Sequence, residues 1–158
     1  MNQDMENSIY NAAAIPNPAL EPFSVLIGEW KTTGSHPKLP GVVISGHTSF
    51  NWLEGGAFIK MYSRMDEEKI PDGIAIFGSD NTKGEFFMLY FDERKISRKC
   101  DVVFHDNVLK WSRSAPEFSQ RYSFTFTDNN NSIISIGEIS ENGTSWEKDL
   151  SLTYTRVK

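Results

Sequence analysis

Cysteine is almost absent from this chain of 158 residues: Cys100 stands alone, so no disulfide can form within the chain. This composition favours a reducing compartment, and we expect a cytoplasmic protein. The first six residues contain neither the basic nor the apolar region of a signal peptide. No apolar run approaches the roughly 18 residues that a membrane-spanning helix requires, so we expect no membrane anchor.

Positive charge is also scarce. The chain has 16 lysines and arginines against 21 acidic residues, which gives a net charge of −5. The basic pairs Arg94-Lys95 and Arg98-Lys99 are interspersed with Asp92, Glu93 and Asp101. Such a chain repels phosphate backbones, so the sequence argues against nucleic acid as a partner.

Histidines are few and poorly spaced for a metal site. His36, His47 and His105 show no ligand spacing such as i,i+2 or i,i+4, and we expect no metal. Cys100 lies in the middle of an apolar strand face, which predicts a buried and inert thiol. No Gly-x-Ser-x-Gly motif is present, so nucleophilic catalysis has little support.

Aromatic residues are plentiful, at 13% of the chain, and they suit β-strands. Turn signals recur at short intervals, and connections this short leave no room for crossover helices. The runs between them predict about ten strands, at residues 28–35, 42–53, 57–65, 73–79, 85–91, 96–104, 108–113, 118–127, 132–139 and 145–157. A meander of this length leaves two exposed edges unless it closes, so we predict an all-β, closed antiparallel barrel.

The N-terminal region differs from the rest. Residues 1–16 have no amphipathic pattern and are expected to form a flexible tail. Asn17 is a plausible N-cap with Pro18 at the first helical position, which predicts a short helical cap before Gly28. The barrel domain would therefore span residues 17–158.

Alternation along the strands predicts which side chains face inward. On the last strand the mixed set would face inward, namely Trp146, Lys148, Leu150, Leu152, Tyr154 and Arg156. The polar set would face outward, namely Glu147, Asp149, Ser151, Thr153 and Thr155. Arg98 and Arg113 also fall on inner faces. The strand 85–91 is apolar on both sides, so its outer side should be covered by the N-terminal segment or by a second subunit in a homodimer.

Two end motifs carry a resemblance. Gly28-Glu29-Trp30 resembles the Gly-x-Trp start of the calycin barrels, and Leu152-Thr153-Tyr154-Thr155-Arg156 resembles their last strand. Further stretches resemble a bacterial calycin-like family of unknown function: Phe50–Phe58, Gly78–Asp80, Tyr90–Asp92, Phe118–Tyr122 and Asn142–Asp149. The resemblance implies a barrel with a central cavity. It also implies that Gly28 opens the first strand and that Trp30 packs on Arg156 to close one end.

The calycins include the nitrobindins, which bind haem through a histidine near the C-terminal strands. Residues 106–158 contain no histidine, and the opening lacks the glycine-rich run typical of nitrobindins. His47 is the remaining strand histidine that could serve. We therefore expect no haem and no other cofactor.

Three functions stay open at this point. The leading hypothesis is a lipocalin-like protein that binds a small apolar or amphipathic ligand, possibly anionic, inside the barrel. The predicted lining consists of Trp52, Met61, Phe77, Met88, Tyr90, Arg98, Trp111, Arg113 and Tyr154. The second hypothesis is a cofactor-free lyase or isomerase, with acid–base candidates Glu138, Tyr90, Tyr154, Arg98, Arg113 and Arg121. The third is a barrel that serves mainly for dimerisation.

Overall fold

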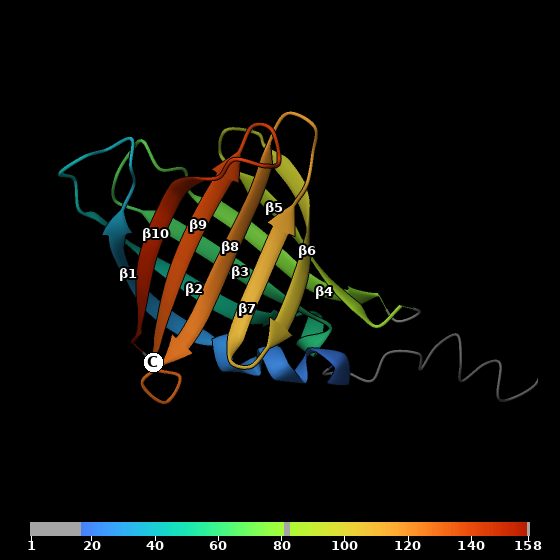
Figure 1. Ribbon diagram of the computed structural model, residues 1–158. Helices are drawn as coiled ribbons and strands as arrows, with labels where there is room; N and C mark the ends of the chain where they lie inside the picture. Colours follow the sequence, from blue (N-terminus) through green and yellow to red (C-terminus); the bar gives the residue numbers. More distant parts are fainter. Residues whose placement is uncertain (1–16, 81–82, 158) are drawn as a thin grey trace, which may run out of the picture.

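Ten antiparallel strands form a closed barrel in a computed structural model that describes residues 17–80 and 83–157. Each strand pairs with its neighbour in sequence, and β1 pairs with β10 to close the sheet (Figure 1). The strands are β1 (Gly28–Ser35), β2 (Ile44–Leu53), β3 (Phe58–Met65), β4 (Gly73–Asp80), β5 (Glu85–Asp92), β6 (Ser97–His105), β7 (Val108–Arg113), β8 (Ser119–Thr127), β9 (Ser132–Ser140) and β10 (Glu147–Arg156). The predicted all-β meander barrel is confirmed.

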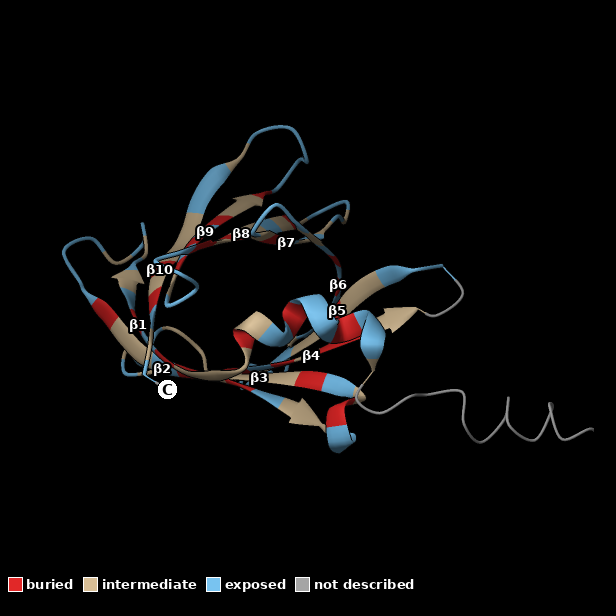
Figure 2. Cartoon of the chain, turned by 90° about the horizontal axis from the view of Figure 1, so that it is seen from below, coloured by how far each residue is buried: buried red, intermediate tan, exposed pale blue. Residues whose placement is uncertain are grey.

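The helical cap is a 3-10 helix, η1 (Pro18–Leu26), which lies across one end of the barrel (Figures 1 and 2). Asn17 caps it as predicted, because its side chain accepts a hydrogen bond of 3.0 Å from the Ala19 amide. A second 3-10 turn, η2 (Glu54–Gly56), joins β2 to β3. No helix in the described ranges is long and apolar enough to cross a membrane. The predicted tail, residues 1–16, lies outside the described residues.

Phe23 of η1 fills the closed end with aromatic packing. Its ring centroid lies 4.8 Å from that of Phe86, 5.4 Å from Phe104 and 6.3 Å from Phe77. These partners come from β5, β6 and β4, so one helical residue ties three strands together. Leu20 and Leu26 of the same helix are buried beside it.

Trp30 and Arg156 form the seal of this end. They are paired across β1 and β10, Trp30 is fully buried, and the Arg156 guanidinium carbon lies 4.1 Å from the centroid of the indole ring. Arg156 also donates hydrogen bonds to the carbonyls of Val25 and Ile27, at 2.6 and 2.8 Å. The Trp30 indole N–H donates to the Leu26 carbonyl at 2.8 Å. The pair thereby satisfies the carbonyls at the end of η1.

A β-bulge changes the direction of the first half of β10. Lys148 pairs with Glu138 and Ser151 pairs with Ile136, so Asp149 and Leu150 together oppose the single residue Gly137. The extra residue reverses the alternation of inward and outward side chains on the N-terminal side of the bulge. The predicted inward placement of Trp146 and Lys148 is therefore wrong, and so is the outward placement of Asp149. On the C-terminal side of the bulge the prediction holds, and the inward side chains are Leu152, Tyr154 and Arg156.

The outer face of β4 and β5 keeps exposed apolar side chains. Ile74 and Phe91 pair across the two strands and remain 39% and 43% exposed. The helix η1 does not cover them, because its buried residues pack on the interior side chains of the same strands. Whether a second copy covers this face stays a prediction.

The Arg156→Lys variant tests the seal. Lysine keeps the charge but cannot reach several carbonyls in a forked geometry or lie flat on the indole. We expect the free energy of unfolding in urea to fall by about 2 kcal/mol. Arg64→Lys is the matched control, since Arg64 is exposed and lies over the outward Tyr62 ring. Equal, small effects for both variants would contradict the assigned role.

Candidate functional site at the mouth of the barrel

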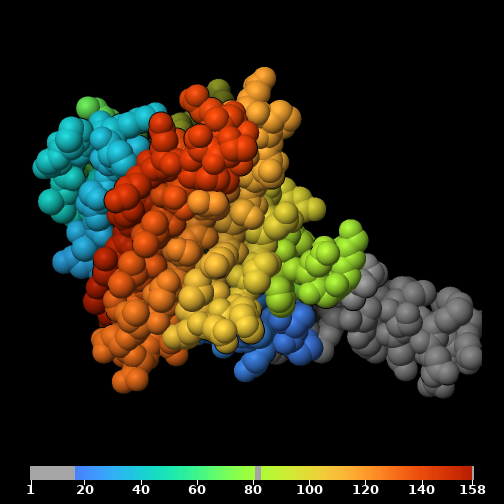
Figure 3. Space-filling model, viewed as in Figure 1, coloured from blue at the N-terminus to red at the C-terminus, as the bar shows by residue number. Residues whose placement is uncertain are grey.

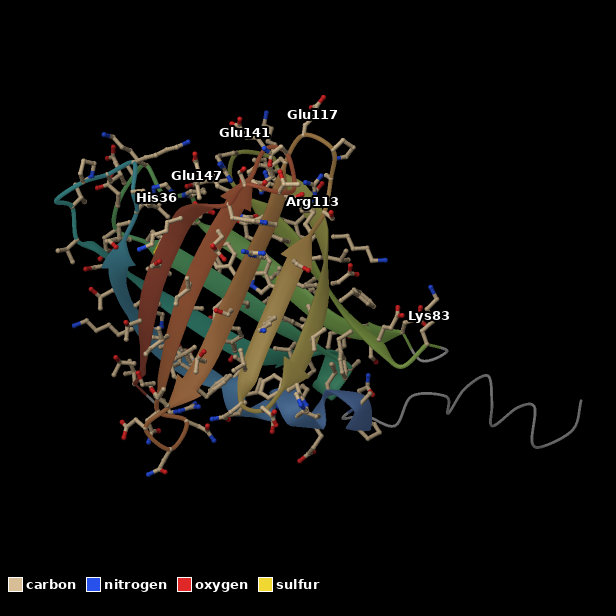
Figure 4. All side chains as sticks on the ribbon, viewed as in Figure 1. His36, Lys83, Arg113, Glu117, Glu141 and Glu147 are labelled. Carbon is tan, nitrogen blue, oxygen red and sulfur yellow. The ribbon has the colours of Figure 1, made fainter. Side chains whose placement is uncertain are left out.

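The end of the barrel opposite η1, here called the mouth, gathers most of the polar interior side chains. It is framed by the loops β1–β2, β3–β4, β5–β6, β7–β8 and β9–β10, as the meander requires. Figure 4 shows His36, Arg113, Glu117, Glu141 and Glu147 together at this end. A pocket of about 390 Å³ opens here, lined by Arg98, Arg113, Ala115, Pro116, Glu117 and Phe118. On the side seen in Figure 3 the wall from β6 to β10 is continuous.

Arg98 and Arg113 supply the positive charge of the pocket. Both sit at inward positions of adjacent strands, β6 and β7, because the apolar residues below them fix the phase. Arg98 donates to the Gln120 side-chain oxygen at 3.3 Å and lies 4.7 Å over the Phe118 ring. Arg113 donates to the Phe118 carbonyl at 2.9 Å. Within the described ranges, neither guanidinium has a carboxylate within 4 Å.

Asp149 is a half-buried anion of the mouth, with its side chain 13% exposed. Its Oδ2 accepts hydrogen bonds from the Gln120 amide and the Tyr122 hydroxyl, both at 2.9 Å, and its Oδ1 lies 2.9 Å from His36 Nε2. Burial alone would raise the pKa of Asp149, but these hydrogen bonds outweigh it and lower the pKa below the ordinary value. The carboxylate therefore stays charged. Gln120 links it to Arg98, since its amide donates to Asp149 and its oxygen accepts from Arg98.

The second nitrogen of His36 fixes its tautomer. Nδ1 accepts a hydrogen bond of 3.0 Å from the Lys38 amide, so the ring proton must sit on Nε2, where it is donated to Asp149. Both ring nitrogens of a neutral His36 are thus occupied. The contact ties the β1–β2 loop to β10 and leaves no free base on the imidazole.

Tyr122 is held in place from two sides. Its ring stacks on Trp111, with centroids 4.3 Å apart and planes 16° from parallel. On the other side it lies against Gly137, where an added Cβ would come within 2.3 Å of the tyrosine ring. Burial and the nearby Asp149 raise the pKa of Tyr122 well above its ordinary value, so the hydroxyl remains a donor.

A separate ion pair occupies the β5 side of the mouth. The Tyr90 hydroxyl donates to Asp92 at 3.0 Å, and Arg94 Nη2 donates to the same carboxylate oxygen at 2.6 Å. Asp92 and Arg94 neutralise each other. Gly73 makes room for this tyrosine, because a Cβ there would lie 2.9 Å from the Tyr90 ring.

The predicted lining residues lie at three depths. Tyr90, Arg98, Trp111 and Arg113 come together at the mouth. Met61, Met88 and Tyr154 face the middle of the barrel, whereas Trp52 and Phe77 face the closed end near η1. Met61, Ser63 and Trp111 face inward yet are only half-buried, so solvent reaches the space between the walls. Cys100 is also inward and buried, and burial raises the pKa of its thiol to about 11 against the opposing effect of Arg113 and Arg98.

Two acid–base candidates face the outside of the barrel. Glu138 and Arg121 pair with each other on the outer face, with Arg121 Nε 2.9 Å from Glu138 Oε1. Arg121 also lies 3.8 Å over the Trp146 ring, which explains the outward turn of that residue. Glu138 therefore cannot act as an interior base.

No described histidine fits a haem inside the barrel. His47 is exposed on the outer face of β2, where it pairs with Glu29. His105 is exposed beside Asp106. His36 has both nitrogens engaged, as described above.

The inference from sequence missed Asp149, Gln120, Tyr122 and His36 as parts of one site. The bulge that turns Asp149 inward has no strong sequence pattern. One weak signal exists, because a glycine inside a strand such as Gly137 often marks a bulge or a close approach.

Comparison with known proteins shows the fold and little else. No family model matches the chain, and no curated protein matches it. Among solved structures, the crystal structure of Rv2717c from M. tuberculosis matches with a TM-score of 0.63 and 12% sequence identity. The match covers 89% of this chain and 98% of that chain. At this identity the likeness is one of fold.

Asp149→Asn tests the network through its pH dependence. The pKa of Asp149 is lowered in the folded state, so its stabilisation is present above the ordinary aspartate pKa and is lost as pH falls through the folded value. We expect the variant to be less stable than wild type at about pH 6, with a gap that narrows towards about pH 3. The difference in the free energy of unfolding between the variant and wild type is measured by urea unfolding across this pH range. Asp101→Asn, exposed on β6, is the control, and a gap independent of pH would refute the assignment.

Proposed function

We propose that the mouth binds a small amphipathic molecule and that the anionic group of this ligand lies at Arg98 and Arg113. The observation that carries this proposal is the pair of arginines beside a pocket of about 390 Å³, without a carboxylate partner in the described part of the chain. A guanidinium binds carboxylate or phosphate groups through forked hydrogen bonds. Each of the two arginines uses one N–H on a neutral oxygen, which leaves most of its donors available.

The surroundings suit the apolar part of such a ligand. Phe118 and Pro116 line the pocket, and Trp111 presents its ring further inside. An apolar chain or ring in contact with these side chains would lose its contact with water, which favours binding by roughly 25 cal/mol per Å² buried. The apolar part of the ligand could point toward the barrel interior or toward solvent. In either orientation its anionic group would stay near the two arginines.

The chemistry of the mouth supports binding over the acid–base alternative. Glu138, the expected base, faces outward. Asp92 and Asp149 are the carboxylates that face the interior at the mouth. Asp92 accepts hydrogen bonds from Tyr90 and Arg94, Asp149 accepts three hydrogen bonds, and the pKa of each is lowered, so both are poor bases. We also retain the calycin family and a cytoplasmic location as parts of the proposal, on the Gly28-Glu29-Trp30 motif and the single, buried Cys100.

Arg98→Gln and Arg113→Gln test the anion site. The probe is decanoate, which joins a carboxylate to an apolar chain, measured by isothermal titration calorimetry. We expect each variant to weaken binding by about tenfold, because a hydrogen bond to a charged group contributes about 1.5–3 kcal/mol. Arg64→Gln removes an outer arginine and should leave binding unchanged. The proposal would be abandoned if all three variants bound decanoate like wild type.

Glu117→Gln should act in the opposite direction. Glu117 lines the same pocket and opposes an incoming anion, although it forms no ion pair with either arginine. We expect decanoate to bind about two- to threefold more tightly, with the gain fading at about 1 M salt. Glu141→Gln serves as the comparison, because Glu141 lies at the same end of the barrel (Figure 4) but does not line the pocket. Equal affinity of the Glu117 variant and wild type at low salt would argue against an anion in this pocket.

A further inference from the structure

Two hydroxyls in the middle of the barrel have no hydrogen-bond partner. Thr32 and Tyr154 are paired across β1 and β10, both face inward, and they are 0% and 4% exposed. Thr32 Oγ1 is the one buried side-chain polar atom of the described residues that lacks a partner. The Tyr154 hydroxyl likewise makes no hydrogen bond within the described ranges, and burial alone raises its pKa.

The two hydroxyls differ in their access to the interior. Thr32 Oγ1 is a fully buried atom, whereas the Tyr154 hydroxyl oxygen is not among the buried unpaired atoms of the described residues and so keeps accessible surface inside the barrel. The same ring could be supplied by phenylalanine at no cost to packing. Tyr154 already packs as an aromatic residue, with its centroid 5.8 Å from that of Phe124. The hydroxyl therefore gives the interior a polar contact that the packing of the ring does not require. Because it stays protonated, it can both donate to and accept from a bound group.

Tyr154 lies deeper in the barrel than the residues of the mouth. On β10 it lies between Asp149, at the mouth, and Arg156, at the closed end. Inward positions of β1, β2 and β4 carry small side chains, namely Thr32, Gly46, Thr48 and Ala75. The stacked rings of Trp111 and Tyr122 lie on β7 and β8, three and two strands from β10 in the sheet. An elongated molecule lying along those rings would have one end at the arginines and the other at Tyr154.

We propose that the ligand is bipolar, with an anionic group at Arg98 and Arg113 and an uncharged hydroxyl or carbonyl that hydrogen-bonds to Tyr154. This inference rests on the proposed function and narrows its ligand class to hydroxy or keto acids with an apolar middle. A simple fatty acid would leave the Tyr154 hydroxyl without a hydrogen bond. A ligand with a second polar group would supply one.

The test compares unbranched alkanoates of about six to twelve carbons with their ω-hydroxy counterparts, because the spacing between the two sites sets the best chain length. Affinities are measured by calorimetry on the full chain. In the wild type we expect the hydroxy acid to bind about tenfold more tightly at its best length. In Tyr154→Phe that preference should disappear, while the affinity for the plain alkanoate stays the same and so reports an intact fold.

Two controls separate this inference from the proposed function. Tyr62→Phe removes an outward tyrosine hydroxyl and should keep the preference. Arg98→Gln should weaken both acids equally and leave their ratio unchanged. A wild-type ratio that Tyr154→Phe preserves at every chain length, or the lack of any preference in the wild type, overturns the bipolar ligand but not the anion site. Failure of both acids to bind the wild type overturns both.

Discussion

The bulge at Asp149 and Leu150 is the constraint on which the mouth of this barrel depends. Without the extra residue opposite Gly137, strict alternation would carry Asp149 to the outer face and turn Trp146 and Lys148 inward. With it, one carboxylate enters the interior and collects donors from β8 and from the β1–β2 loop. Gly137 has two roles here. It is the residue that opposes the bulge, and its lack of a side chain leaves room for the Tyr122 ring.

The two ends of the barrel use arginine in different ways. Arg156 donates hydrogen bonds to the carbonyls of Val25, Ile27 and Asn130, and its guanidinium group packs on the Trp30 ring. Its role is therefore structural. Arg98 and Arg113 each make one hydrogen bond to a neutral oxygen. This difference separates the closed end, which is a structural seal, from the mouth, which retains unused binding capacity.

The strands and their order were predictable from sequence because local chemistry determines them. The Asp, Asn, Gly and Pro residues of the turns mark the strand ends, and short connections allow little but a meander. The resemblance of Gly28-Glu29-Trp30 and Leu152–Arg156 to calycin ends anticipated the contact of Trp30 with Arg156. The site was harder, because its members come from β6, β7, β8, β10 and a loop, and one register shift decides whether they meet. Glu138 was taken for an interior group although its neighbour Arg121 already balances it outside.

The charges inside the mouth explain why an anion is the expected partner. Asp92 and Arg94 cancel as an ion pair. Asp149 is hydrogen-bonded to Gln120, Tyr122 and His36, so neither Arg98 nor Arg113 forms an ion pair with it. Two arginines, Arg98 and Arg113, then stand against two carboxylates, Asp149 and Glu117, so the positive and negative charges are equal in number. Among the described residues no carboxylate lies within 4 Å of either guanidinium, so both arginines keep N–H donors for the anionic group of a ligand. An additional uncharged polar group on that ligand would reach the Tyr154 hydroxyl without adding charge to the interior.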